Sequence, residues 1–193
     1  MIETFDDLFD PFYNNHVIEG LKNFPGWRLA SMSEADSGTP LNAQFSDTGF
    51  LLQTYTRNSS DGYNPKLNAY ADIIFAKVLS QSKYAFNDVN PYRYFWNYYN
   101  TASTGILHRD ILPSIDGNYM SILYNLNDND GGTEVDNLVY TSQQGRAIMF
   151  NSRTLHKGIG PTQSKQRFSL NIVFQYSTKV LKNVSTKTNR ILL

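Results

Sequence analysis

The residues best suited to chemistry are a histidine and an aspartate in the stretch GILHRDILP, residues 105–113. Alternate side chains of an extended chain point to the same side, so His108 and Asp110 would face one way and Arg109 the other. An imidazole and a carboxylate placed in this way suit neighbouring positions around one metal ion. The pair alone does not establish a metal site, because a structural histidine that is hydrogen-bonded to a carboxylate at a strand edge has the same spacing.

Residues farther along the chain strengthen the metal interpretation. The chain has three histidines, and His156 lies in NSRTLHKGIGP, at the end of another expected strand. Beyond it, Arg167, Ser169 and Asn171 share one face of the apolar stretch RFSLNIVF. Arginine offers a two-pronged donor and serine one more donor, which together suit a bound carboxylate. Two histidines and one carboxylate leave three positions of an octahedral metal open, and they are the ligand set of non-heme iron(II) sites.

The ordered set His108-x-Asp110, His156 and Arg167-x-Ser169 resembles the 2-oxoglutarate- and iron(II)-dependent oxygenases, in particular their prolyl-4-hydroxylase-like branch. The resemblance covers roughly residues 90–176 and extends to SILYNLNDNDGGTEVDN and FNSRTLHKGIGPT. It implies that His108, Asp110 and His156 bind iron(II) and form the catalytic centre. It also implies that Arg167 and Ser169 hold the distal carboxylate of 2-oxoglutarate.

Three further residues are candidates for contact with the co-substrate. Tyr98 precedes His108 by ten residues, where this branch often has a tyrosine lining the pocket, but it is also one of many aromatics in YRYFWNYY. Tyr124 and Asn125 are open alternatives, since the pattern leaves the parity of their strand undecided. Their run also departs from the tyrosine-leucine-asparagine run that is usual in the family.

The resemblance implies a dioxygenase that hydroxylates its substrate while 2-oxoglutarate is converted to succinate and CO2. Iron(II), 2-oxoglutarate and dioxygen are the expected cofactors and co-substrates, with ascorbate as an additional reductant. Asp110 favours hydroxylation, because related halogenases have a small residue at that position. The substrate is expected to be a peptide, with peptidyl proline first, or a small molecule. Residues 31–66, which would supply substrate contacts, match no known pattern.

Two other functions remain open on the residues alone. A zinc hydrolase would use the same three ligands, but it leaves Arg167 and Ser169 without a role. The nearest candidate for its general base is Glu134. A jelly-roll binding or structural module would instead use the many tyrosine and tryptophan side chains as a recognition surface. Metal analysis of the purified protein would distinguish the three functions. Iron would indicate the oxygenase, zinc the hydrolase, and the absence of metal the binding or structural module.

The composition of the 193 residues predicts one folded domain over residues 1–193, with 40% hydrophobic and 18% charged residues. Seventeen basic and 17 acidic residues give a net charge of zero, which disfavours nucleic acid as a partner. The absence of cysteine excludes disulfides and thiolate ligands and suits a cytoplasmic setting. The start MIETFDDLFD lacks the pattern of a signal peptide, and no apolar run approaches the ~20 residues that cross a membrane.

The elements that must position these residues divide the chain in two. Helical spacing of apolar residues predicts a short helix in DPFYNNHVIEGLKNFPGW, ended by Pro25-Gly26, and a longer one in LNAYADIIFAKVLSQS. Residues 31–66 otherwise predict irregular structure with one strand near residues 50–52. From about residue 87, seven short aromatic and β-branched runs predict antiparallel strands, and a basic tail follows Ser177. We therefore expect an α+β fold, a jelly roll (the double-stranded β-helix of the resemblance) over about 87–177, with supporting N-terminal helices.

Overall fold

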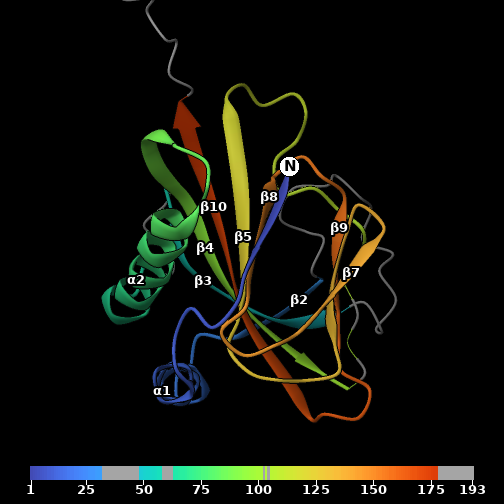
Figure 1. Ribbon diagram of the computed structural model, residues 1–193. Helices are drawn as coiled ribbons and strands as arrows, with labels where there is room; N and C mark the ends of the chain where they lie inside the picture. The colour runs from blue at the N-terminus through green and yellow to red at the C-terminus, as the bar shows by residue number, and fades with distance from the viewer. Residues whose placement is uncertain (32–47, 58–62, 102, 104, 178–193) are drawn as a thin grey trace, which may run out of the picture.

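The computed structural model describes residues 1–31, 48–57, 63–101, 103 and 105–177, and within them it contains two helices and ten strands (Figure 1). In chain order these are β1 (Ile2–Phe5), α1 (Pro11–Lys22), β2 (Arg28–Ser31), β3 (Thr48–Thr56), α2 (Pro65–Gln81), β4 (Asn87–Asn100), β5 (Asn118–Asn125), β6 (Gly132–Val135), β7 (Leu138–Thr141), β8 (Ala147–Asn151), β9 (His156–Ile159) and β10 (Gln166–Ser177).

The strands form two antiparallel sheets. The large sheet has the order β1-β8-β5-β10-β4-β3-β2, and the small sheet has the order β7-β6-β9. They pack together where Val135 of the small sheet meets Leu123, Ile148 and Phe150 of the large one. Two packed antiparallel sheets with long crossovers are a jelly roll. The expected fold class is confirmed, with both helices on the outer face of the large sheet (Figure 1).

Both helices begin at a capping side chain that is followed by proline. The Asp10 carboxylate accepts a hydrogen bond from the Tyr13 N–H at 2.8 Å, and the Asn64 side chain accepts one from the Leu67 N–H at 2.9 Å. Such caps satisfy backbone donors that the first helical turn leaves unpaired, and proline suits that turn. The prediction of both helices is confirmed. The shorter one ends at Lys22, before the Pro25-Gly26 pair that was expected to end it.

The helix-facing side of the large sheet forms the main core. Trp96 of β4 and Leu170 and Ile172 of β10 are fully buried there, together with Ile74 of α2. Burying a large apolar side chain contributes roughly 1.5–3 kcal/mol to stability. The alternate residues of β4 and β10 point to the other side, toward the small sheet, because strand side chains alternate between faces.

The segment that carries His108 is extended but is not the regular strand that GILHRDI predicted. Within it only His108 forms a bridge, with His156, while the Gly105 N–H donates to the Gly158 carbonyl at 2.8 Å. A Cβ atom on Gly105 would lie 2.9 Å from the backbone nitrogen of Gly158, so the close approach needs glycine there. The segment therefore runs alongside β9 and brings the two histidines together.

Two predictions fall outside the described residues. The stretch 31–66 is described only in part, where the strand expected near residues 50–52 is present as β3. The basic tail after Ser177 is not described. Neither α1 nor α2, the helices of the described part, has the length and apolar character that crossing a membrane requires.

Candidate metal centre

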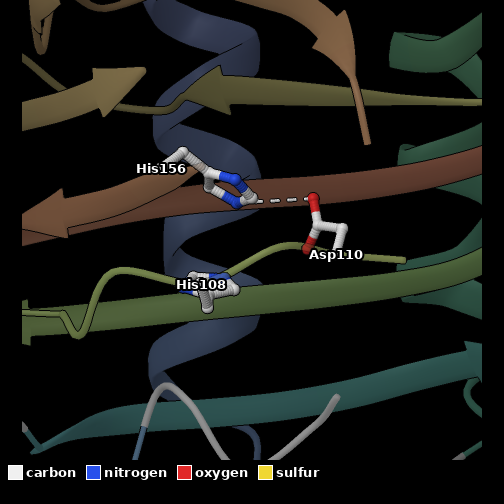
Figure 2. A group of neighbouring side chains, drawn as sticks. All are labelled: His108, Asp110 and His156. Carbon is white, nitrogen blue, oxygen red and sulfur yellow. Dashed lines mark ion pairs between the residues drawn. The ribbon is translucent and has the colours of Figure 1, made fainter. Parts of the chain in front are cut away.

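The structure brings His108, Asp110 and His156 together between the two sheets (Figure 2). One possible ligand atom from each residue lies within 4.8 Å of those of the other two. Paired backbone bonds fix this arrangement, since the His108 N–H donates to the His156 carbonyl at 2.9 Å and the His156 N–H donates back at 3.0 Å. Three side chains of the types and number that bind a catalytic metal therefore converge on one point.

Both histidines are oriented by the same kind of hydrogen bond. His108 Nδ1 lies 2.8 Å from the Ile106 carbonyl, and His156 Nδ1 lies 2.9 Å from the Thr154 carbonyl. A carbonyl only accepts hydrogen bonds, so each neutral ring carries its hydrogen on Nδ1 and a lone pair on Nε2. This is the arrangement in which histidine binds a metal through Nε2.

The contact between His156 and Asp110 fits a cation between them. His156 Nε2 lies 3.4 Å from Asp110 Oδ2, drawn as the dashed line in Figure 2, and it makes no hydrogen bond within the described residues. With its hydrogen on Nδ1, a neutral His156 turns a lone pair toward a carboxylate oxygen. Two lone-pair atoms at this distance repel each other unless a proton or a metal ion lies between them. The donor set therefore fits a bound metal.

The ionisation states also suit metal binding. Burial, followed by the neighbouring His156, lowers the pKa of His108 to about 4, so its ring is neutral near pH 7. Burial alone would raise the pKa of Asp110, but His156 and Arg93 outweigh it and hold this pKa below its usual range. A neutral imidazole and an ionised carboxylate are the forms that bind a metal.

Asp110 is held by three side chains from the large sheet. Arg93 Nη2 donates to Asp110 Oδ1, and the Ser121 hydroxyl donates to Oδ2. The Asn171 amide reaches both oxygens, at 3.2 Å and 3.3 Å. Asp110 is 1% exposed, so these bonds take the place of water around the carboxylate.

A second polar cluster surrounds Arg167, which is fully buried on the same face of β10. Its guanidinium donates to the Thr133 hydroxyl at 2.8 Å and to the Ile159 carbonyl at 3.3 Å, and it lies 5.2 Å from the centre of the Tyr99 ring. No acidic side chain of the described residues pairs with it, and its Nε makes no hydrogen bond there. Burial lowers the pKa of Arg167. A buried cation without an anion is costly, so this cluster fits a carboxylate ligand.

Ser169 lies between the two clusters. It follows Arg167 and precedes Asn171 on one face of β10, and it is 1% exposed. Its hydroxyl has no hydrogen-bond partner among the described residues. The sequence-based expectation that Arg167, Ser169 and Asn171 share one face agrees with this arrangement.

The structure contradicts the expectation for Tyr98. Tyr98 pairs in register with Phe168 and packs on the helix-facing side, with ring centres 4.9 Å apart. There it lines a cavity of about 320 Å³ with Trp27, Phe50 and others. The expected tyrosine was displaced by one residue. Neighbouring residues of a strand face opposite sides of the sheet, and Tyr99 is the residue that pairs with Arg167. Tyr99, not Tyr98, faces the second cluster.

The open choice between Tyr124 and Asn125 is resolved in the same way. The side-chain oxygen of Asn125, Oδ1, accepts from the Ser142 hydroxyl at 2.9 Å and lies 3.5 Å from Arg167 Nη2. The Tyr124 hydroxyl donates to Asn14 of α1, on the opposite face. Asn125 therefore belongs to the Arg167 cluster and Tyr124 to the core.

Sequence reasoning missed four residues of these clusters: Arg93, Tyr99, Ser121 and Thr133. The signal for two of them was present in the alternation of YRYFWNYY, where Arg93 and Tyr99 share one face. That face becomes the site only through the register of β4 with β10, which pairs Arg167 with Tyr99. Ser121 and Thr133 carried no comparable signal.

No protein-family model matches this sequence, and no curated protein matches it either. Solved structures do match it. A viral collagen prolyl hydroxylase of Paramecium bursaria Chlorella virus-1, solved with 2-oxoglutarate, is 14% identical with a TM-score of 0.58, covering 90% of this chain and 96% of that chain. A 2-oxoglutarate/Fe(II) oxygenase-family oxidoreductase of Burkholderia pseudomallei is 12% identical with a TM-score of 0.65, covering 90% and 84%.

A third similar structure is a prolyl hydroxylase of Trichoplax adhaerens in complex with a peptide fragment of hypoxia-inducible factor. It is 14% identical with a TM-score of 0.56, and the match covers 91% of this chain and 82% of that chain. At these identities the likeness concerns the fold. The chain has the jelly-roll fold of the 2-oxoglutarate- and Fe(II)-dependent oxygenases, with a His-Asp-His cluster inside it.

Proposed function

We propose that the protein is a 2-oxoglutarate- and Fe(II)-dependent dioxygenase that hydroxylates its substrate. The observation that carries the proposal is the pairing of two buried clusters on one face of β10. One is the His108, Asp110 and His156 donor set, and the other is Arg167 without an acidic partner among the described residues. A metal ligand set beside an unneutralised cation fits an iron(II) ion with a bound dicarboxylate.

Each residue has a distinct task in this proposal. His108, Asp110 and His156 hold iron(II). Arg167 binds the distal carboxylate of 2-oxoglutarate through its guanidinium, and the Thr133 hydroxyl, 2.8 Å from Nη2, fixes the direction of that group. The Ser169 hydroxyl, which has no partner among the described residues, adds a donor between the carboxylate anchor and the metal ligands. Asp110, His156, Arg167 and Ser169 are each at most 3% exposed.

The chemistry that iron(II) supplies at such a site is activation of dioxygen, which couples decarboxylation of 2-oxoglutarate to hydroxylation of a substrate C–H bond. Asp110 supplies the carboxylate of the ligand set, which favours hydroxylation over halogenation. The products from the co-substrate are succinate and CO2. Ascorbate belongs in the assay as a reductant that keeps iron in the ferrous state.

For the substrate, we propose a peptide, with a prolyl side chain as the first candidate. Two of the similar structures are prolyl hydroxylases, and one of them was solved with a peptide. Those substrates belong to those proteins, and they guide the choice of the first peptides to test here.

The two alternative functions fit the structure less well. Glu134, the candidate base of a zinc hydrolase, is engaged by Lys157 at 3.0 Å on the pair β6–β9. A binding or structural module has no use for a buried Arg167 without an acidic partner in the described part of the chain. Only the oxygenase proposal gives both clusters a role.

The proposal is tested by measuring succinate from 2-oxoglutarate by NMR, with Fe(II), ascorbate and air, with and without proline-containing peptides. We expect slow succinate formation without peptide and at least tenfold faster formation with a true substrate. The matched controls are His156→Ala, which should be inactive, and His16→Ala, an exposed histidine of α1 that should behave as wild type. Iron-loaded wild-type protein that forms no more succinate than His156→Ala contradicts the proposal.

A further inference from the structure

The two oxygens of Asp110 have different surroundings. Oδ1 accepts hydrogen bonds from Arg93 and from the Asn171 amide at 3.2 Å. Oδ2 accepts from the Ser121 hydroxyl and from the same Asn171 amide at 3.3 Å, and it is the oxygen that lies 3.4 Å from His156 Nε2. The side of the carboxylate toward His156 is therefore Oδ2, whereas Oδ1 carries the ion pair.

Arg93 has little freedom to release Oδ1. It is 5% exposed, and its guanidinium carbon lies 4.7 Å from the centre of the Phe95 ring. Its backbone is fixed in β4, in register with Val173 of β10. A charge-assisted bond between buried groups is costly to break, because the separated charges would lack water. A metal that approached Oδ1 would also have to share this oxygen with a cation.

We infer that Arg93 is a positioning residue that restricts Asp110 to binding the metal through Oδ2 alone. The inference rests on the proposed iron site. Carboxylates bind metals through one oxygen or through both, and the choice changes the number of open coordination positions. With one oxygen from Asp110 and one nitrogen from each histidine, three of six positions stay open. A chelating co-substrate would use two of these positions and dioxygen the third. Binding of the second Asp110 oxygen would leave only two positions open.

A positioning role and a purely structural role of Arg93 predict different results when Arg93 is replaced. A structural ion pair would affect the stability of the fold and leave the ligation of the metal unchanged. A positioning residue determines how many Asp110 oxygens contact the metal and how well a chelating ligand competes for the remaining positions. Both properties are measurable without turnover.

The test uses the full chain loaded with Mn(II) as a redox-stable substitute for iron. Crystal structures report the ligation by Asp110, and calorimetry reports the affinity for 2-oxoglutarate. We expect wild-type protein to show Oδ2 alone on Mn(II), with Oδ1 still bonded to Arg93. In Arg93→Met we expect both oxygens on Mn(II) and at least a tenfold loss of 2-oxoglutarate affinity. Arg93→Lys keeps a charge and should remain within threefold of wild type.

Arg109→Met is the matched control, because Arg109 lies beside the same ligands but donates from Nε to the Arg153 carbonyl at 2.9 Å instead of to Asp110. It should keep one-oxygen ligation and wild-type affinity. Two-oxygen ligation in wild-type protein overturns the inference whether or not the Arg93 variants fold, and so does unchanged ligation in Arg93→Met. One-oxygen ligation without 2-oxoglutarate binding overturns the proposed function and supports the role of Arg93. Absence of Mn(II) from the triad overturns both.

Discussion

The two faces of the β4–β10 strand pair are made of alternating residues of the same strands, and they differ in chemistry. On the helix-facing side, Trp96, Leu170 and Ile172 are apolar and fully buried. On the other side, Arg167 and Ser169 are equally buried but polar, at 0% and 1% exposure. In each of these two residues a polar side-chain atom lacks a hydrogen-bond partner within the described residues.

We therefore expect the two faces of this strand pair to contribute differently, one to stability and the other to ligand binding. Apolar burial on the helix side stabilises the fold. Buried polar atoms without partners cost free energy, so the polar face lowers stability until a ligand satisfies it. The comparison therefore predicts that substitutions on one face change folding and that substitutions on the other change ligand binding.

The largest effect is expected from removing a metal ligand on the polar side. His108→Ala should abolish turnover, by at least a thousandfold, because only two protein ligands remain. The protein should stay folded but contain little iron, as measured by metal analysis and circular dichroism. His16→Ala is the matched control with an intact site. An active His108→Ala enzyme would remove the triad assignment.

The next effect is expected from Leu170→Ala on the helix-facing side. Removing a fully buried leucine leaves a cavity and should cost about 2–5 kcal/mol of unfolding free energy. Urea denaturation measures this loss. Ser169→Ala, the neighbouring residue on the polar face, should change stability by less than about 1 kcal/mol, because it removes a hydroxyl without a partner among the described residues. Equal losses in the two variants would contradict the division between the faces.

Arg167→Ala should leave metal binding intact and weaken 2-oxoglutarate binding. Hydrogen bonds to charged groups contribute about 1.5–3 kcal/mol each, so a loss of roughly 10- to 150-fold in affinity is expected. Calorimetry on the anaerobic iron-loaded protein measures it. An unchanged affinity for 2-oxoglutarate would show that the carboxylate anchor lies elsewhere.

The smallest effect separates two neighbouring tyrosines. Tyr99→Phe should weaken 2-oxoglutarate binding by up to about tenfold, the value of one hydrogen bond, because Tyr99 faces the Arg167 cluster. Tyr98→Phe, on the opposite face, should leave the affinity within twofold. The reverse order of the two effects would restore Tyr98 as the co-substrate residue.

The neighbouring tyrosines also show how far the sequence alone was able to predict the site. The convergence of the candidate ligands His108, Asp110 and His156 was predictable, because residue types with a definite chemistry recur at short spacings in strand-like runs. The choice between Tyr98 and Tyr99 was not, because it depends on the register of β4 against β10, which neither strand encodes alone. The ion pair of Arg93 with Asp110 depends on the same register.

The fold shows the same division between local and distant determinants. The two helices were predictable from the local spacing of their apolar residues. The irregular segment before His108 was not, because its path follows from close backbone packing of Gly105 against Gly158 on β9. Apolar residues there resembled a strand pattern, while the hydrogen bonds that shape the segment come from a distant part of the chain.

The central claim is that the His108, Asp110 and His156 cluster and Arg167 serve one iron(II) ion and one 2-oxoglutarate. Its most direct test is anaerobic titration of Fe(II)-loaded protein with 2-oxoglutarate, followed through the visible metal-to-ligand charge-transfer band. We expect a band that saturates at one equivalent, is absent in His156→Ala and needs far more 2-oxoglutarate in Arg167→Ala. A folded wild-type protein that binds iron and shows no band at saturating 2-oxoglutarate would contradict it.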